Sequence, residues 1–320
     1  MAPSIISTYG LDTPRQIATD GTELYVMCQE NLRRLTFVGS TFIPGQLQNL
    51  GGAGRGVFVD GAVVHTGVYT SGIGARSASD ITTLLDSDAF NYGEGVWSDG
   101  SEVHIAADVL GLRRYSWSGS AYTYLYGFNP TEFGGRVDKI GNIIALGTFG
   151  GSRVYLLRDT GSAYAQLDVG ATFSADEGVR VWMQDASTLW AGDRTELRLY
   201  DISADTLNLL DTYSGPGISP MLHTDGFRIL ASGDDTIALY RRSGSEIVQD
   251  ATFTDAVTFS NLAEMVLLDG IVFILDRNEF IVAAFDPDFP AIDLQPPIGP
   301  TPPYLRMYQH LLPRAKAWKI

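Results

Sequence analysis

The chain has 320 residues, 35 of them glycine, and a formal net charge of −15. A field of that sign repels phosphates, so we expect no nucleic acid among its partners. The single cysteine, Cys28, excludes an internal disulfide, and the longest apolar runs, such as Ile271 to Leu275, are too short to span a membrane. The N-terminus has no basic stretch ahead of an apolar run, so we expect no signal peptide and synthesis in a reducing cytoplasm.

The first predicted element is a strand over residues 4–10, similar in sequence to residues 122–127 further along. A turn signal then recurs through most of the chain. It consists of five Asp-Gly pairs and two weaker copies, at Asp20-Gly21, Asp60-Gly61, Asp99-Gly100, Ile140-Gly141, Asp185-Ala186, Asp225-Gly226 and Asp269-Gly270. The second positions are separated by 40, 39, 41, 45, 40 and 44 residues. Asp-Gly between apolar runs predicts a hairpin with a type I′ turn.

Apolar residues keep fixed offsets from these turns. Four residues before the second turn position stand Ile17, Val57, Val96, Val137, Leu222 and Val266, and the fifth unit has Val181 one place early. Three residues after it stand Leu24, Val64, Val103, Ile144, Leu189, Ile229 and Phe273. Five residues after it stand Val26, Thr66, Ile105, Leu146, Ala191, Ala231 and Leu275. Positions +3 and +5 share one face of a strand, so we predict that both columns are buried.

A second turn follows each first one, at Gly39-Ser40, Ser79-Asp80, Gly119-Ser120, Gly161-Ser162, Ala204-Asp205, Gly244-Ser245 and Pro287-Asp288. Each unit of about forty residues therefore contains four antiparallel strands. Such units resemble the blades of a β-propeller, without the Gly-His and Trp-Asp pairs of WD repeats or the paired glycines of kelch repeats. We predict an all-β fold, a seven-bladed β-propeller over residues 1–294, with residues 4–10 closing the last blade. A right-handed β-helix is the rival, but its coils are shorter.

The composition changes after the seventh unit. Residues 295–303 contain five prolines in nine residues, which predicts a semi-rigid linker. Residues 304–320 carry four basic residues and no acidic one. Leu305, Tyr308, Leu311 and Leu312 form an apolar stripe at helical spacing, and Pro313 ends the helix.

The run from Tyr308 to Trp318, Tyr-x-x-Leu-Leu-Pro-Arg-x-x-x-Trp, resembles a segment of tail and baseplate proteins of tailed bacteriophages. In that family a similar motif opens a domain that docks onto the tail, and those relatives continue beyond the position of Ile320. The resemblance implies virion tail proteins as partners of residues 304–320. The partner-binding residues would be Leu305, Tyr308, Leu311, Leu312, Pro313, Arg314 and Trp318. Two alternatives are that this segment packs on the propeller or that it binds a membrane surface.

No catalytic motif is found: the chain lacks Gly-x-Ser-x-Gly, a phosphate-binding loop with Gly-Lys-Ser/Thr, and His-Glu-x-x-His. We therefore predict no catalytic residues, no cofactor and no metal. His65 and His104 occupy equivalent places in neighbouring units, so we assign them a structural role rather than metal ligation. Cys28 lies on an inner strand, where it is expected to pack.

Acidic residues gather in the loops between the second and third strands of three successive units. They are Asp193, Glu196, Asp234, Asp235, Asp276 and Glu279. In a propeller these loops lie on the same face as the blade-to-blade connections, so we predict an acidic patch. It is either a solvated turn surface or a site for a cation, a basic partner or acid–base work on a sugar.

We expect a non-enzymatic structural protein of a tailed-phage virion, made in the bacterial cytoplasm. Its propeller would recognise a host-surface glycan or protein, or contact neighbouring subunits, while residues 304–320 tether it to other tail proteins. The fold alone does not establish this, because propellers host many functions. The alternatives are a propeller enzyme acting on glycans or lactones and a bacterial scaffold that binds peptides.

Overall fold

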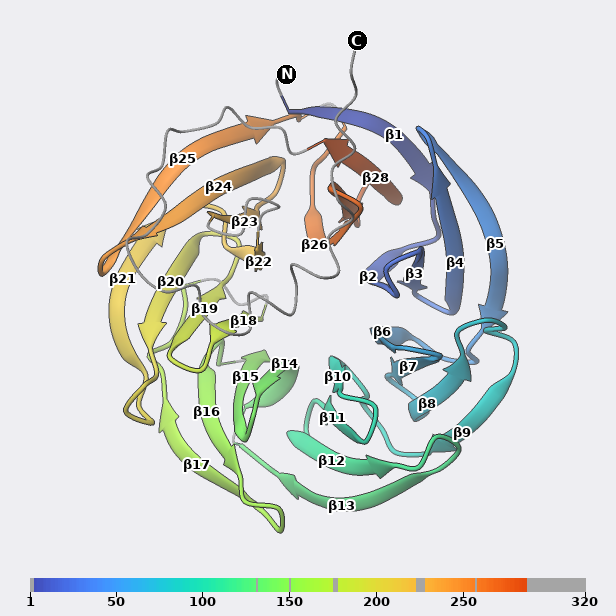
Figure 1. The fold of residues 1–320 in the computed structure, drawn as a ribbon, viewed down its shortest axis with the longest axis horizontal. Helices are drawn as coiled ribbons and strands as arrows, with labels where there is room; N and C mark the ends of the chain where they lie inside the picture. The colour runs from blue at the N-terminus through green and yellow to red at the C-terminus, as the bar shows by residue number, and fades with distance from the viewer. Residues whose placement is uncertain are drawn as a thin grey trace, which may run out of the picture.

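A computed structural model describes residues 3–130, 132–149, 151–174, 178–222, 228–256 and 258–286. Over these ranges the chain forms 28 β-strands in seven four-stranded antiparallel sheets, with no helix. The sheets are arranged as blades around one axis (Figure 1). The predicted seven-bladed β-propeller is confirmed. The described residues therefore contain no helix that could cross a membrane.

Each of the first six blades uses four consecutive strands, ordered from the axis outward. Blade 1 is formed by β2 (Pro14–Thr19), β3 (Glu23–Cys28), β4 (Asn31–Val38) and β5 (Thr41–Asn49). Blade 2 is formed by β6 (Gly54–Asp60), β7 (Val63–Val68), β8 (Gly72–Ser77) and β9 (Leu84–Asp88). Blade 3 is formed by β10 (Val96–Ser98), β11 (Glu102–Ala106), β12 (Leu112–Trp117) and β13 (Tyr122–Phe128). Blade 4 is formed by β14 (Phe133–Ile140), β15 (Ile143–Phe149), β16 (Val154–Asp159) and β17 (Tyr164–Val169). Blade 5 is formed by β18 (Arg180–Asp185), β19 (Thr188–Gly192), β20 (Glu196–Asp201) and β21 (Asn208–Ser214). Blade 6 is formed by β22 (Ile218–Leu222), β23 (Arg228–Ser232), β24 (Thr236–Ser243) and β25 (Glu246–Thr254).

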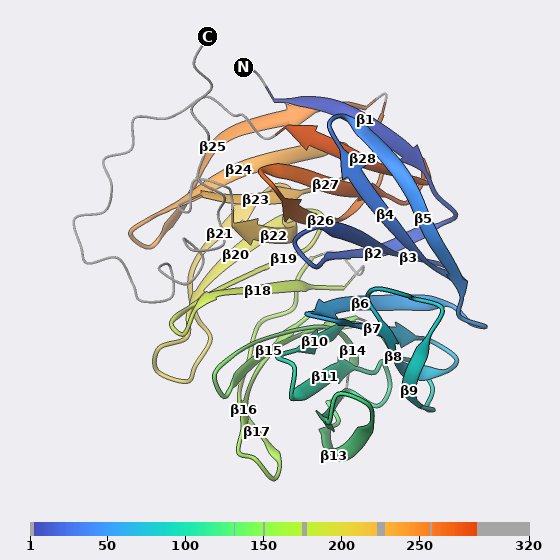
Figure 2. The same ribbon diagram turned by 45° about the vertical axis from the view of Figure 1, so that its right-hand side comes forward.

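The seventh blade is completed by the N-terminal strand. It contains β26 (Leu262–Leu268), β27 (Ile271–Asp276), β28 (Ile281–Asp286) and β1 (Ser4–Gly10). β1 pairs with β28 from Ser4↔Asp286 to Gly10↔Ile281, and Figure 2 shows it running along the outside of that blade. The predicted role of residues 4–10 is confirmed, and pairing both ends of the chain in one sheet closes the ring.

The hairpin positions are confirmed where the structure describes them, but the predicted turn type is wrong at most of them. Among the Asp-Gly pairs that the structure describes, only Asp269-Gly270 has positive φ at both residues, 51° and 82°. At Asp20 and Asp99 the aspartate keeps ordinary backbone angles, and its carboxylate instead accepts hydrogen bonds from the amides two and three residues later. This side-chain cap stabilises the turn without requiring a left-handed aspartate.

The displaced Val181 of the fifth unit has a structural cause. β18 carries a bulge between Met183 and Asp185, so one extra residue precedes the turn. Val181 nevertheless pairs with Ala191, as Ile17 pairs with Val26 in the first blade. The repeat is therefore kept in space although it slips in the sequence.

In the described part of the chain, the core consists of seven apolar clusters, each shared by two adjacent blades. Thirteen of the fourteen residues in the predicted +3 and +5 columns belong to these clusters, and the exception is the polar Thr66; each of the fourteen side chains is at most 1% exposed. The predicted turns at Asp225-Gly226 and Pro287-Asp288 lie outside the described residues. So do the linker 295–303 and the segment 304–320, including Leu305, Tyr308, Leu311, Leu312, Pro313, Arg314 and Trp318.

Candidate functional site

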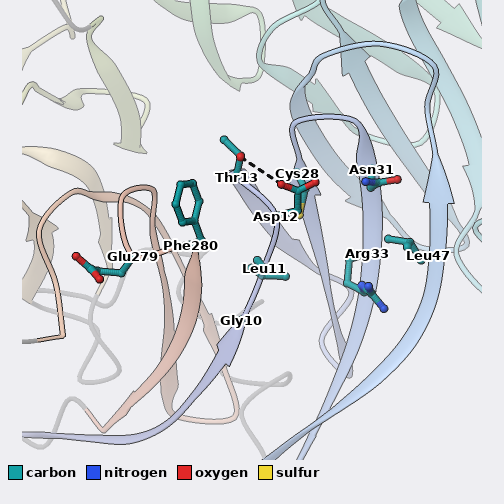
Figure 3. Close-up of a pocket in the computed structure, with 10 residues that line it drawn as sticks. All are labelled: Gly10, Leu11, Asp12, Thr13, Cys28, Asn31, Arg33, Leu47, Glu279 and Phe280. Carbon is teal, nitrogen blue, oxygen red and sulfur yellow. Dashed lines mark hydrogen bonds between the residues drawn. The ribbon is translucent and has the colours of Figure 1, made fainter.

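A cavity of about 650 Å³ lies where the ring closes, and we call it the closure groove. Its size falls within the range of small-molecule sites. Figure 3 shows the segment after β1 running between the β27–β28 loop on one side and blade 1 on the other. The lining residues are Gly10, Leu11, Asp12, Thr13, Cys28, Asn31, Arg33, Leu47, Glu279 and Phe280.

The β27–β28 loop forms one wall of the groove, and the fully buried Asp276 stabilises this loop through hydrogen bonds. One carboxylate oxygen of Asp276 accepts from the amides of Ser260 and Asn261, each at 2.7 Å. The other accepts from the amides of Asn278 and Glu279, each at 2.9 Å. A carboxylate with four backbone donors is fully engaged, so Asp276 positions this loop rather than a ligand.

Two residues of the groove have left-handed backbone angles, which residues other than glycine rarely adopt. Thr13 has φ of 43° and Phe280 has φ of 54°. The Leu11 amide donates to the Phe280 carbonyl at 2.6 Å, which links the two segments that carry them. Such strain persists only where the surroundings impose it, and it is common at ligand sites.

The groove presents an aromatic ring beside charged groups. Phe280 is 47% exposed, Leu47 is 48% exposed, and Asp12, Arg33 and Glu279 line the same space. A ligand with an apolar face and several hydrogen-bonding groups could be bound by this combination. Reading the sequence for acidic loops identified Glu279 but missed Phe280, Asp12 and Arg33.

Cys28 closes the inner end of the groove and is 2% exposed. Burial raises the pKa of its thiol to about 11. The thiol is therefore protonated at neutral pH and is a poor nucleophile. Cys28 also belongs to the core cluster shared by blades 1 and 7, where it packs as expected.

The predicted acidic residues mostly engage their own loops. Asp193, 1% exposed, accepts from the amides of Thr195 at 2.7 Å and Glu196 at 2.9 Å. Its role matches that of Asp276. Glu196 in turn accepts from the Arg198 guanidinium at 3.0 Å.

The other acidic residues are more accessible. Asp234 accepts from the Arg194 guanidinium at 3.1 Å, and Asp235 from the Thr236 hydroxyl at 2.9 Å. Glu279 accepts from the Ser260 hydroxyl at 3.0 Å. Of the six predicted carboxylates, Glu279 lines the closure groove. Binding of a cation or a basic partner by this set stays a prediction.

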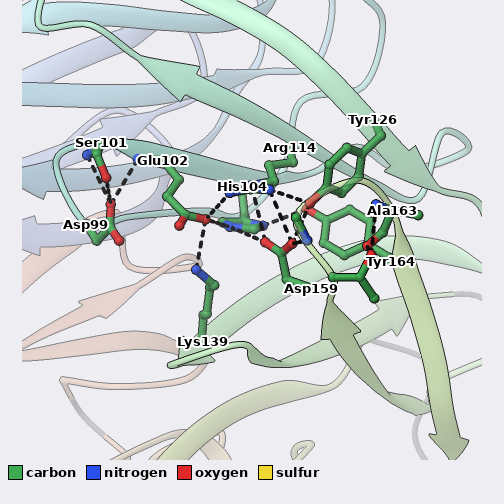
Figure 4. Close-up of polar contacts among 12 residues, drawn as sticks. Asp99, Ser101, Glu102, His104, Arg114, Tyr126, Lys139, Asp159, Ala163 and Tyr164 are labelled. Carbon is green, nitrogen blue, oxygen red and sulfur yellow. Dashed lines mark hydrogen bonds and ion pairs between the residues drawn. The ribbon is translucent and has the colours of Figure 1, made fainter.

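A second polar cluster lies between blades 3 and 4 (Figure 4), and His104 is its one member that the sequence analysis singled out. His104 on β11 is fully buried, with Nδ1 2.6 Å from the Tyr164 hydroxyl and Nε2 3.0 Å from Glu102 Oε2. The Arg114 guanidinium bridges Glu102 and Asp159, at 3.2 Å from each. Glu102 stands two residues before His104 and therefore on the same strand face, and this spacing is the signal in the sequence that could have linked the two side chains.

Glu102, His104 and Asp159 lie close enough to share a metal ion, with ligand atoms within 4.8 Å of one another. Two cations already occupy the place where it would bind. Lys139 Nζ is 2.9 Å from Glu102 Oε2, and Arg114 contacts both carboxylates. The hydrogen bond from His104, followed by that from Lys139, lowers the pKa of Glu102 to about 2 despite its partial burial. This set therefore fits an ion-pair network joining two blades better than a metal site.

His65 repeats this arrangement one blade earlier. Its ring is fully buried, and Nδ1 lies 2.7 Å from the hydroxyl of Tyr122, a residue of the next blade. Burial lowers the pKa of His65 to about 4 and also lowers that of His104. Both imidazoles are neutral at pH 7 and connect neighbouring blades.

No protein-family model and no curated protein matches this chain. Solved structures with a similar fold do match. A chain of the mitotic checkpoint complex has a TM-score of 0.72 at 10% identity, over 88% of this chain and 93% of that one. The WD40 beta propeller domain of Doa1 has a TM-score of 0.70 at 12% identity, over 91% and 99%. The computationally designed Ika8 protein has 0.62 at 11%, over 87% and 98%. At these identities the likeness concerns the fold alone.

Proposed function

We propose that this chain is a non-enzymatic structural protein of a tailed-phage virion. Its propeller displays the closure groove toward a host-surface glycan or protein, and residues 304–320 tether it to other tail proteins. The proposal rests on the resemblance of Tyr308 to Trp318 to a tail-docking segment, together with the set of strands that forms the seventh blade. Because β1 supplies its fourth strand, all seven blades are complete without any residue after Asp286. The basic segment 304–320 is therefore not required by the sheets and can serve a partner.

The groove supports a binding role. It combines an exposed Phe280 ring with Asp12, Arg33 and Glu279, which suits a ligand that has both an apolar face and hydroxyl groups. The thiol of Cys28 in the groove is protonated. His104, in the separate cluster between blades 3 and 4, is neutral and hydrogen-bonded at both ring nitrogens. These groups favour reversible binding over covalent catalysis.

The tether is tested by incorporation into particles. The full chain, a Trp318→Ala variant and a Trp97→Phe variant are expressed with a set of tailed-phage tail proteins, and the purified particles are probed for each. Trp97 serves as the control because it lies on β10, outside residues 304–320. We expect the full chain and Trp97→Phe in the particles and clearly less Trp318→Ala, because an aromatic anchor often carries much of the binding energy. Equal incorporation of all three, or absence of the full chain from particles, would refute the proposal.

The host-recognition part is tested separately. A Phe280→Ala variant should bind host cells more weakly than the full chain, while a Leu84→Ala variant should bind equally well. Leu84 is a suitable control because it is 51% exposed and lies on the outer strand of blade 2, away from the groove. Equal binding by Phe280→Ala would remove the groove from the proposal.

A further inference from the structure

A second, much smaller cavity of about 10 Å³ lies near the propeller axis, and we call it the axial cavity. Its walls come from blades 5, 6 and 7, whose inner strands β18, β22 and β26 follow one another around the axis (Figure 1). The lining residues are Gly178, Arg180, Arg194, Ile218, Leu262, Ala263 and Arg277. This described lining contains three guanidinium groups and no carboxylate, in a chain whose net charge is −15.

Arg180 is the most deeply buried of the three, at 5% exposure. Among the residues that the structure describes, its buried Nη1 has no hydrogen-bond partner. Its Nε lies 3.4 Å from Glu264 Oε2 but without the geometry of a hydrogen bond. A buried charged donor without an acceptor is unfavourable, so such an atom indicates a missing ligand.

Arg277 reaches the same cavity from the β27–β28 loop. Its Nε is also buried and has no hydrogen-bond partner in the described part of the chain. The carboxylate of Glu264 is shared, since it also lies 3.7 Å from Arg136 Nε. Glu264 therefore interacts with the guanidinium groups of Arg136, Arg180 and Arg277, and Glu94 is a second described carboxylate that favours the charged form of Arg180.

The pKa values of the arginines also indicate an excess of positive charge around the cavity. Burial, and then the neighbouring Arg136, lower the pKa of Arg180 to about 9 and that of Arg277 to about 10. Arg15 and Arg194 act on Arg277 in the same direction, whereas Glu264 opposes them. The potential at the cavity is therefore positive.

We propose that the axial cavity binds a small anion of the size of chloride, held between Arg180 and Arg277. A volume of about 10 Å³ holds roughly one water-sized occupant, which excludes phosphate without rearrangement. The anion accepts hydrogen bonds from donors that otherwise have none and offsets part of the repulsion among the arginines. Because Arg180 belongs to blade 5 and Arg277 to blade 7, the bound anion stabilises the closed ring. This inference does not depend on the proposed virion function.

The test is thermal unfolding at constant ionic strength, with chloride exchanged for gluconate. A ligand that binds the native state raises Tm with its concentration, so raising chloride from about 1 mM to about 100 mM should raise the wild-type Tm by several degrees. An Arg277→Met variant should lose this dependence. The matched control is Arg158→Met, because Arg158 pairs with Asp205 away from the axis, and it should keep the dependence.

Bromide, which scatters anomalously, provides a readout that needs no variant. A wild-type crystal soaked in bromide should show an anomalous peak between Arg180 and Arg277. The same chloride dependence in all three proteins, or a cavity that contains only water after the soak, would overturn the proposal. A larger stabilisation by phosphate than by chloride would overturn the assignment to a monatomic anion.

Discussion

His65 should make the stability of this propeller sensitive to mild acid. The imidazole is fully buried between blades 2 and 3, where it meets the Tyr122 hydroxyl and the edge of the Trp117 ring. Burial disfavours the charged imidazolium and lowers the pKa of His65 from 6.5 to about 4. Between these two values the unfolded chain binds a proton that the folded protein does not. Stability from the neutral imidazole is therefore fully present above pH 6.5 and is lost as the pH falls toward 4.

The magnitude follows from the two pKa values. Their separation of about 2.5 pH units corresponds to about 3 kcal/mol of unfolding free energy. The perturbation is His65→Asn, which places a hydrogen-bonding atom near the position of Nδ1 but does not titrate in this range. Between pH 7 and pH 4, the wild type should lose about 3 kcal/mol more than this variant.

Urea denaturation at several pH values measures this difference. Tyr122→Phe is the informative control, because it removes the hydrogen bond and leaves His65 buried. It should lower stability at every pH by about 1–3 kcal/mol while its pH dependence stays close to that of the wild type. If the wild type and His65→Asn lose stability in parallel, the assignment of this acid sensitivity to His65 is wrong.

Three further predictions concern ring closure and blade contacts. Deleting residues 1–10 removes six pairings between β1 and β28 and exposes the edge of β28, so calorimetry should show a sharply lower Tm; an unchanged melt would reject the closure. Gly56→Ala would place a Cβ 1.7 Å from the carbonyl oxygen of Glu94, which lies in the segment that leads into blade 3, so urea melts should show a loss of about 3 kcal/mol or more. Gly10→Ala, which meets nothing within 4 Å, should be nearly neutral, and equal losses in the two variants would contradict the packing argument. Lys139→Met removes a buried cation 2.9 Å from Glu102, so the Glu102 pKa followed by carboxyl NMR should rise; an unchanged value would mean that Lys139 does not stabilise the carboxylate.

The fold could be predicted because its determinants are local and repeated. A hairpin needs only a turn signal and alternating residues around it, and the same offsets at Leu24, Val64 and Val103 define one buried strand face in successive blades. Residues 4–10 could be assigned to the last blade because a ring needs a strand at that edge. Where the pattern slipped, at Val181, the cause was a bulge that pairing partners reveal and a single strand does not.

The sites were less predictable, because their members come from separate blades. The loops with Asp193 and Asp276 could be identified, but only the folded loops show that these carboxylates accept from their own backbone amides. Spacing along the chain also does not show that Arg33 and Phe280 line one groove. These two residues are far apart in the sequence and lie side by side because β1 pairs with β28 and closes the ring.

The sequence by itself therefore determined the blade, its repeat number and the strand that closes the ring, since each depends on short-range patterns of burial and turn formation. Only the tertiary structure decided which charged groups meet. Glu102 and Asp159, from neighbouring blades, lie within 4.8 Å of each other, and Arg180 and Arg277, from blades 5 and 7, line the same cavity. Electrostatic interactions depend on distance and burial, and both are set by how the blades stack rather than by any one of them.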